Sequence, residues 1–507
     1  MQLAQHLPAT VAISKPLVSK VSGLFARLSN DLYRSLVFKK DALLHKTYPL
    51  FSPYKSALLR KPPAMAAELL ANVTFEENIR SAYLRGVKCT FTQGDKRQSY
   101  DLVLRHSSVA TILFHTGMKK MILVKQFRPA VLVGHVLRQP ENFNKKLGEI
   151  DWTKYDASNG YTLELCAGMI DKKLPVIDIA REEIEEECGY AVKNEDIHFV
   201  TTFNVAAHES GGVQYLFYAE INDSMKVTEG GGNPSEDEYI TKVFLTEDEI
   251  RALVSSEYPP SPSSMLYALM WWLENKCSKQ VNAVTTGSYE WHPKDVVPLT
   301  NLEFEQMPLS DRFIPLRMHF TIGSLSRSWD LALCHESFAI LLYDEDRKEL
   351  IFTQRFRPAA LIGLARHRAP PKTKLESIDW SLQPSEWAYT IELCSGHYER
   401  NASKEQIVKQ VKECVARRCG YLINEMDFVT SYLIGISFSG DRQKVYYAKV
   451  NSSMKVKDWK PLEDVIPCSI PFDKVPAYLQ TPTDVPTRPP AVMLMMQWFL
   501  NRQLQRV

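Results

Sequence analysis

Five glutamates fall within six residues of one predicted helix, in the run Glu182-Glu183-Ile184-Glu185-Glu186-Glu187. On an α-helix, Glu183, Glu186 and Glu187 occupy positions i, i+3 and i+4, so their side chains share one face. Carboxylates on one face repel one another unless a cation lies among them. Oxygen ligands of this kind suit Mg²⁺ or Mn²⁺, which also bind the oxygens of phosphorylated substrates. A solvated acidic helix face is the alternative interpretation of such a run, and the flanking residues favour the metal site.

A short strand and an amphipathic helix are the elements that would position these carboxylates. The strand is predicted over Tyr161–Leu165 and ends at Gly168. The helix is predicted from Ile177 to Cys188 and is stopped by Gly189. Its apolar stripe consists of Ile177, Ala180, Ile184 and Cys188.

The surrounding segments alternate between strand and helix patterns. Two β-branched runs, Val109–Phe114 and Met121–Val124, flank a His-Thr-Gly turn and predict a hairpin. Further predicted elements are strands at Ile197–Phe203, Val213–Ile221 and Ile240–Phe244 and a helix from Pro262 to about Lys276. A mixed sheet with a helix on either side predicts an α/β sandwich.

The chain contains two copies of one domain. Gln126-Phe127-Arg128-Pro129-Ala130 recurs as Arg355-Phe356-Arg357-Pro358-Ala359, and Cys188-Gly189-Tyr190 recurs as Cys419-Gly420-Tyr421. A repeat of about 230 residues is too long for a solenoid and indicates a duplicated globular unit. The predicted division is an N-terminal extension (1–71), a first copy (72–277), a linker (278–299) and a degenerate second copy (300–507).

The second copy has lost the acidic helix face. Cys414, Arg417 and Arg418 occupy the positions of the three glutamates when Gly420 is taken as the anchor. Three more residues separate Gly396 from Gly420 than separate the equivalent glycines of the first copy. Since guanidinium groups repel a divalent cation, the second copy is not expected to bind a catalytic metal. Direct phosphate contact by the arginine pair and a structural, dimer-like role are both open.

Composition restricts the partners. A hydrophobic content of 45% and a charged content of 24% are typical of a soluble globular protein. The net charge of +2 and the lack of an 18-residue apolar run argue against nucleic acid and membrane partners. Nine cysteines without a CxxC pair indicate reduced thiols and a cytoplasmic location. Residues 1–64 hold ten basic residues and two acids, so this segment is either a disordered extension or a mitochondrial transit peptide.

Residues 168–190 resemble the signature of the Nudix hydrolase family, G-x5-E-x7-R-E-U-x-E-E-x-G-U, where U is a bulky apolar residue. The matching positions are Gly168, Glu183, Ile184, Glu186, Glu187, Gly189 and Tyr190. Leu174 replaces the first family glutamate, and Glu182 replaces the family arginine. Outside the signature, residues 75–276 resemble the UDP-sugar diphosphatase branch, through Tyr83-Leu84-Arg85, Val124–Val131 and Gly230-Gly231-Gly232.

The resemblance implies two tandem α/β/α sandwiches with mixed sheets. It also implies hydrolysis of the pyrophosphate bond of UDP-glucose or a related UDP-sugar to UMP and sugar 1-phosphate, with Mg²⁺ or Mn²⁺ as cofactor. Another nucleoside diphosphate sugar, such as ADP-ribose, is the alternative substrate. A non-catalytic nucleotide-binding scaffold is the alternative of another class. Because members of this branch are commonly dimers, the fused copies are expected to form an intramolecular pseudo-dimer, or the chain a homodimer.

The resemblance also implies roles for individual residues. The expected metal ligands are Glu183, Glu186, Glu187 and the backbone carbonyl of Ala167, with Glu186 also expected to take part in catalysis. The general base is expected in the loop after Gly232, where Glu236 and Glu238 are the candidates. Arg128 and Arg85 are the expected substrate-binding residues. Arg128 has a structural role as its alternative, and Glu164 is expected to support the site.

Overall fold

The computed structural model describes residues 69–503, except 78, 80, 82–83, 234–237, 278–287, 307–313, 371–372, 482 and 484–486. The predicted targeting or disordered segment, 1–64, lies outside the described residues. Residues Met65–Val507 form one compact unit. Among the described residues, no helix is both long enough and apolar enough to cross a membrane.

The first copy is built on a seven-stranded mixed sheet with the strand order β10-β5-β4-β9-β8, in which β6 also pairs with β5 and β7 with β4. β4 and β9 run parallel, and the other pairs are antiparallel. The strands are β4 (Ser108–His115), β5 (Lys120–Phe127), β6 (Tyr161–Glu164), β7 (Cys166–Met169), β8 (Ile197–Val205), β9 (Gly212–Ile221) and β10 (Ile240–Leu245).

The second copy repeats this topology. Its sheet has the order β16-β15-β14-β19-β18, with β17 paired to β14 and β20 to β15, and again a single parallel pair, β14 with β19. The strands are β14 (Glu336–Asp344), β15 (Glu349–Phe356), β16 (Tyr389–Glu392), β17 (Cys394–Tyr398), β18 (Asp427–Ile434), β19 (Asp441–Val450) and β20 (Val465–Pro471). The predicted fold class of two tandem α/β units is confirmed.

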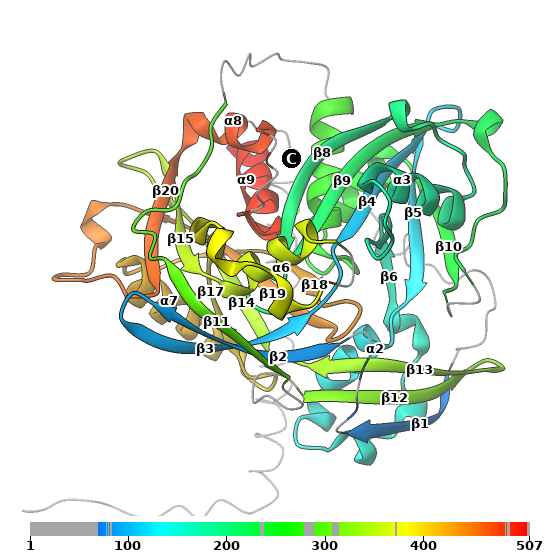
Figure 1. Cartoon of the computed structure of the whole chain (residues 1–507), viewed down its shortest axis with the longest axis horizontal. Helices are drawn as coiled ribbons and strands as arrows, with labels where there is room; N and C mark the ends of the chain where they lie inside the picture. The colour runs from blue at the N-terminus through cyan, green and yellow to red at the C-terminus, as the bar shows by residue number, and fades with distance from the viewer. Residues whose placement is uncertain are drawn as a thin grey trace, which may run out of the picture. The chain divides into compact units, whose positions relative to one another are not determined.

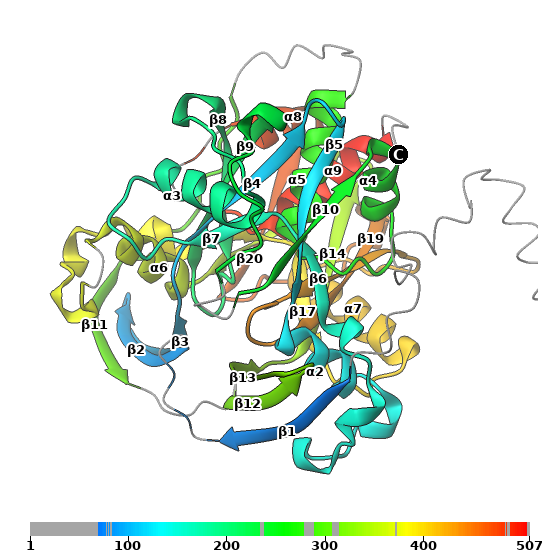
Figure 2. The same ribbon diagram turned by 90° about the vertical axis from the view of Figure 1, so that its right-hand side faces the viewer.

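Helices follow equivalent strands in the two copies (Figures 1 and 2). The first copy has α2 (Pro129–Leu137), α3 (Val176–Glu183), α4 (Glu247–Val254) and α5 (Ser263–Trp272). The second copy has α6 (Pro358–Arg368), α7 (Lys404–Cys419), α8 (Val475–Gln480) and α9 (Pro490–Gln503). The terminal helices of the two copies, α5 and α9, pack against each other.

The acidic helix differs from its counterpart in regularity and length. α3 has eight residues and continues as a five-residue π-helical turn over Ile184–Cys188, which carries Glu186 and Glu187. α7 is an uninterrupted α-helix of 16 residues, and Ser403 caps its N-terminus. The three extra residues of the second copy therefore lie within the helix. π-helical turns of this kind occur frequently at functional sites.

The two copies exchange their first strands. β1 (Leu70–Glu77) pairs with β12 (Ile314–Ile322) in a sheet completed by β13 (Leu325–Leu333). Reciprocally, β11 (Leu299–Gln306) pairs with β2 (Arg85–Gln93), next to β3 (Lys96–Leu104). Figure 1 shows the dark-blue β1 beside the green β12 and β13. The boundaries at 72, 277 and 300 stay predictions, and β1 begins two residues before the first of them.

The exchange produces a core shared by the two copies. Each copy has its own apolar cluster between its sheet and its α3 or α7 helix. A third cluster joins α2 and the end of β5 to the inner face of β12 and β13. Its large members from the second copy are Leu316, Met318, Phe320, Ile322 and Leu331.

Glycines allow the copies to approach closely, and the contacts are reciprocal. A Cβ at Gly134 in α2 would lie 2.3 Å from the carbonyl oxygen of Gly440 in the second copy. A Cβ at Gly363 in α6 would lie 2.0 Å from the carbonyl oxygen of Gly211 in the first copy. The same patch on each copy therefore contacts the other, as in an isologous dimer.

Replacing Gly211 by alanine tests this close approach. Gly211 has φ +61°, and its Cβ would lie 1.8 Å from the carbonyl oxygen of Ala359. Gly323 has φ +58° with nothing within 4 Å, so Gly323→Ala is a matched control for backbone strain alone. We expect Gly323→Ala to cost about 1 kcal/mol and Gly211→Ala to cost a further ~1–3 kcal/mol. Equal melting temperatures for the two variants in calorimetry would contradict the close contact.

Candidate active site

Glu187 is the buried carboxylate of the acidic helix. Its side chain is 2% exposed, and its Oε2 accepts a hydrogen bond from the backbone N–H of Ala167 at 3.0 Å. Burial raises the pKa of Glu187 well above its ordinary value, and Cys188 and Glu238 raise it further. The ionised carboxylate is therefore unfavourable here unless a cation lies nearby.

Glu183 lies against the strand turn at Gly168. A Cβ at Gly168 would lie 1.8 Å from Oε1 of Glu183, so glycine is needed for this carboxylate to occupy its place. Burial, and then the charges of Glu238 and Glu186, raise the pKa of Glu183 to about 7. The turn and the helix therefore bring a second carboxylate into the same acidic neighbourhood.

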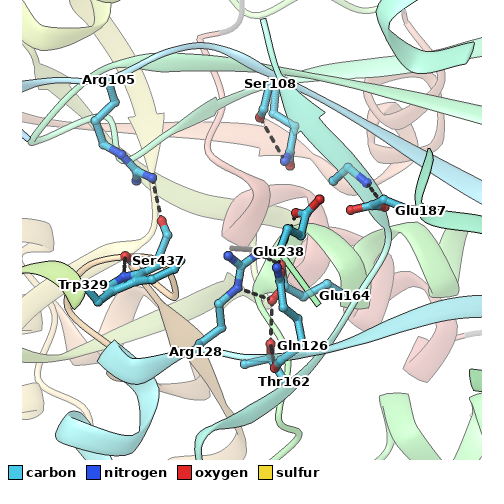
Figure 3. Close-up of polar contacts among 12 residues, drawn as sticks. Arg105, Ser108, Gln126, Arg128, Thr162, Glu164, Glu187, Glu238, Trp329 and Ser437 are labelled. Carbon is cyan, nitrogen blue, oxygen red and sulfur yellow. Dashed lines mark hydrogen bonds and ion pairs between the residues drawn. The ribbon is translucent and has the colours of Figure 1, made fainter. Parts of the chain in front are cut away.

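Glu238 approaches the helix from the loop before β10. Nε2 of Gln126 donates to its Oε1 at 3.3 Å, and its backbone N–H donates to the carbonyl of Asn233 at 3.1 Å. Burial raises the pKa of Glu238, and the charge of Arg128 offsets part of this rise. Figure 3 shows Glu238 beside Gln126 and Arg128. Glu236, the other predicted general base, lies outside the described residues.

Arg128 and Glu164 form a bidentate ion pair beside this cluster. Nε and Nη2 of Arg128 donate to the two carboxylate oxygens at 2.8 and 2.7 Å, and the Thr162 hydroxyl donates to Glu164 at 2.5 Å (Figure 3). Burial opposes ionisation of Arg128, but Glu164 outweighs it and raises the pKa of the guanidinium. Nη1 takes no part in this pair.

The second copy keeps an equivalent arginine–glutamate ion pair, although it lacks the glutamates of the acidic helix. Arg357 donates to both oxygens of Glu392 at 2.7 Å, and the Thr390 hydroxyl donates to Glu392 at 2.8 Å. Burial disfavours the ionised form of Glu392, yet Arg357 lowers its pKa to about 2. Because the second copy keeps this ion pair without the acidic helix face, the pair has a structural role in each copy. Arg128 therefore shares the structural role that was expected of Glu164.

Substituting lysine for each arginine separates the structural role of Arg128 from a role in substrate binding. Lysine cannot make the planar two-point contact. We expect Arg128→Lys and Arg357→Lys each to lower stability by about 1.5–3 kcal/mol, the usual worth of a hydrogen bond to a charged group. Only Arg128→Lys is expected to raise KM as well. Equal KM values for the two variants would leave Arg128 with the structural role alone.

Two of the predicted site residues do not lie among the buried carboxylates: Glu186 lies at their edge, and Arg85 lies away from them. Glu186 is exposed and lines an open groove of about 480 Å³ together with Glu229 and Gly232. Arg85 is exposed at the start of β2, where its charge lowers the pKa of Arg366, a guanidinium that burial already disfavours. The predicted substrate-binding role of Arg85 therefore has no support from the cluster geometry.

Arg105, at the end of β3, was not anticipated. Burial lowers its pKa, Glu209 opposes this effect, and the nearby charge of Arg128 lowers it further. Its Nη2 donates to the Ser437 hydroxyl of the second copy at 2.6 Å, and Trp329 donates to the Ser437 carbonyl (Figure 3). No local spacing links Arg105 to the acidic helix, so only the assembled fold reveals it.

The donor set fits a divalent cation. Glu183, Glu187 and Glu238 offer carboxylate oxygens only, the ligands that Mg²⁺ and Mn²⁺ prefer. Their raised pKa values reflect burial and mutual repulsion, which a cation would relieve. Within the described ranges, no group of three or more His, Cys, Asp or Glu side chains is arranged so that it could hold a metal ion. The fit therefore rests on donor chemistry and charge, and the role implied for the Ala167 carbonyl stays a prediction.

Comparisons with known proteins place the chain among diphosphate hydrolases. No protein-family model matches it. It is 32% identical over 199 residues to uridine diphosphate glucose pyrophosphatase NUDT14 of Bos taurus, covering 38% of this chain and 88% of that protein. The Mus musculus protein of the same name is 31% identical over 204 residues, with the same coverage. GDP-mannose pyrophosphatase of Cronobacter sakazakii is 27% identical over 192 residues, covering 36% of this chain and 84% of that protein.

A solved structure described as an ADP compounds hydrolase is 17% identical, with a TM-score of 0.27, and covers 42% of this chain and 97% of that one. The sequence relatives carry the assignment, because the chain spans 88% of a relative at 32% identity. Together with the Gly168–Tyr190 signature and the carboxylates gathered around it, they show that the chain belongs to the Nudix hydrolase family.

Proposed function

We propose that the first copy hydrolyses the pyrophosphate bond of a UDP-sugar, with UDP-glucose as the reference substrate, to UMP and sugar 1-phosphate. The proposal is supported by the neighbouring carboxylates of Glu183, Glu187 and Glu238, whose pKa values are raised by burial and mutual repulsion that a bound cation would relieve. The relatives named for UDP-glucose support this choice of nucleotide sugar.

Mg²⁺ is the proposed cofactor, with Mn²⁺ as a substitute. A bound divalent ion neutralises phosphate charge and makes water more acidic. Glu183 and Glu187 are the side chains that would hold it from the helix, and Glu186 would join them from the groove. These carboxylates offer oxygen ligands, which a hard cation such as Mg²⁺ prefers.

Glu238 is the proposed general base. Hydrolysis forms a bond between the water oxygen and one phosphorus and breaks the bridging P–O bond, so a proton must be accepted from the water. The raised pKa of Glu238 makes this carboxylate a better proton acceptor than an ordinary exposed one. The hydrogen bond from Gln126 holds its side chain toward the cluster.

Arg105 and Arg128 are proposed to face the substrate phosphates. Both guanidinium groups are partly buried, and they lie close enough for the charge of Arg128 to lower the pKa of Arg105. Two like charges held together are stabilised when an anion lies between them. We propose that the second copy contributes Ser437 and Trp329 to this side of the site and acts as an intramolecular partner.

The direct test is release of UMP from UDP-glucose by the full chain in the presence of Mg²⁺. EDTA should abolish release, and Mg²⁺ or Mn²⁺ should restore it. GDP-mannose is the second candidate substrate, because a relative named for it covers most of its own length. Comparing kcat/KM for UDP-glucose, GDP-mannose and ADP-ribose decides among them. Metal-dependent nucleotide binding without turnover of any of the three would favour the scaffold function instead.

A further inference from the structure

The turn of the second copy that corresponds to the active site is lined by arginines. Arg357 holds Glu392, and the charges of Arg357 and Arg418 both act on Arg355. Burial is the main cause that lowers the pKa of Arg355, and Arg357 lowers it further. The charge of Glu392, and then that of Asp464, partly offset these effects.

Matched strand and helix positions show that the charge is inverted relative to the first copy. In the first copy Gln126 stands opposite Ile240 in the β5–β10 pair, and in the second copy Arg355 stands opposite Val465 in the β15–β20 pair. Arg418 takes the place of Glu187, two residues before the glycine that ends the helix. An amide and a carboxylate have thus been replaced by two guanidinium groups.

The helix residue at this position also changes from hydrogen-bond acceptor to hydrogen-bond donor toward the neighbouring strand. In the first copy, Glu187 accepts a bond from the N–H of Ala167. In the second copy, Nη1 of Arg418 donates to the carbonyl of Ser395, the residue equivalent to Ala167. The arginine is therefore built into the turn by a backbone contact rather than extended into solvent.

Not all of the donors in this arginine cluster are satisfied by the protein. The Nε atoms of Arg355 and Arg418 are buried and have no hydrogen-bond partner in the part of the chain that the structure describes. Glu392 is already bound on both oxygens by Arg357. Buried cationic donors without partners are costly, and an oxyanion is the ligand that such donors accept most readily.

Two histidines and a tyrosine lie beside this turn, and burial lowers the pKa of His397 to about 4, so that its ring is neutral at pH 7. The rings of His335 and His397 lie 6.1 Å apart, and His397 is adjacent to Gly396 in β17. Tyr100, from the first copy, hydrogen-bonds with Arg357, and its hydroxyl donates to the carbonyl of His208. The first copy therefore supplies polar groups to the turn of the second.

We propose that Arg355, Arg357 and Arg418 form a metal-independent binding site for a phosphate or diphosphate group in the second copy. Phosphate oxygens suit guanidinium groups, which bind them with paired, charge-assisted hydrogen bonds. The arginines supply the positive charge that a divalent cation would supply in the first copy. The site goes beyond the proposed hydrolysis, because it requires neither metal nor turnover.

Calorimetric titration of the full chain with inorganic pyrophosphate in EDTA tests the site. EDTA removes metal-dependent phosphate binding by the first copy, and the substitutions at Arg355 and Arg418 then separate the second-copy site from any contact that Arg105 and Arg128 make. We expect the wild type to bind pyrophosphate, and Arg355→Gln and Arg418→Gln each to weaken binding by about tenfold or more. Arg418→Lys, which keeps the charge, should retain part of the affinity. Parallel titrations with UMP and glucose 1-phosphate identify which source of the phosphate group binds most tightly.

Lys409→Gln is the matched control, because Lys409 lies on the same helix, is exposed and pairs with Glu413. It removes one positive charge without touching the arginine cluster. Thermal melts of each variant verify folding, and Arg418→Gln decides the test if Arg355→Gln fails to fold. The proposal is overturned if the wild type does not bind pyrophosphate in EDTA. Equal weakening by Lys409→Gln and Arg418→Gln would also overturn it. Neither result depends on whether the first copy hydrolyses UDP-glucose.

Discussion

Replacing Glu187 by glutamine is expected to lower kcat by about 10²-fold or more, the effect of removing one charge-stabilising group from a preorganised site. Glutamine keeps the size of the side chain and an oxygen that can accept the Ala167 N–H bond. It removes the negative charge on which cation binding depends. Kinetics of UMP release at saturating UDP-glucose and varied Mg²⁺ measure the loss.

The same variant should be more stable than the wild type in EDTA at neutral pH. Burial raises the pKa of Glu187 in the folded protein, so ionisation favours the unfolded state. This penalty grows as the pH rises above the unfolded pKa and disappears at lower pH, where both states bind the proton. Melting temperatures in EDTA should therefore differ at pH 8 and converge near pH 4.

Glu185→Gln is the matched control for both measurements. Glu185 is exposed on the same π-helical turn, between the candidate ligands in sequence. This variant should keep wild-type kcat and melting temperature. If Glu187→Gln retained wild-type turnover, or if Glu185→Gln lost as much activity, the carboxylate assignment would be wrong.

The local elements of the first copy could be predicted because their signals lie within short stretches of sequence. Residue alternation and helical periodicity predict the hairpin of β4 and β5 and the strands β8 to β10. The glycine at 189 predicts the end of the acidic helix, and the structure places it at φ +82°. Of the signature carboxylates, Glu183 lies against Gly168 and Glu187 accepts a hydrogen bond from Ala167, whereas Glu186 is exposed. The π-helical turn within that helix has no signal in the residue pattern.

The strand exchange and the composite parts of the site could not be predicted from the sequence. The paired residues of β1 and β12, from Leu70↔Ile322 to Glu77↔Leu316, lie about 240 to 250 positions apart in the sequence, and no local pattern fixes such a register. For the same reason, Arg105 and Trp329 meet at Ser437 only once both copies are folded. The helix α2 was not among the elements predicted from the sequence, although Pro129 at its first position is a favourable start for a helix.

The first copy expressed alone, as residues 65–277, is expected not to fold as a monomer. It lacks β11, the partner of β2, and it lacks β12, the partner of β1. It also loses Leu316, Met318, Phe320, Ile322 and Leu331 from the shared cluster. At about 1.5–3 kcal/mol for each buried side chain, this loss is comparable to the whole stability of a domain, about 5–15 kcal/mol.

Sedimentation at micromolar concentration should therefore show the fragment as aggregates or as a homodimer that repeats the strand exchange between two molecules. The full chain should sediment as a monomer. A longer fragment, residues 65–333, is the matched control, because it restores β11, β12 and β13 while still omitting the sheet of the second copy. We expect it to be more soluble and more cooperative in thermal unfolding than residues 65–277. A monomeric and fully active 65–277 fragment would show that the exchanged strands are dispensable, and the role of the second copy as an intramolecular partner would have to be abandoned.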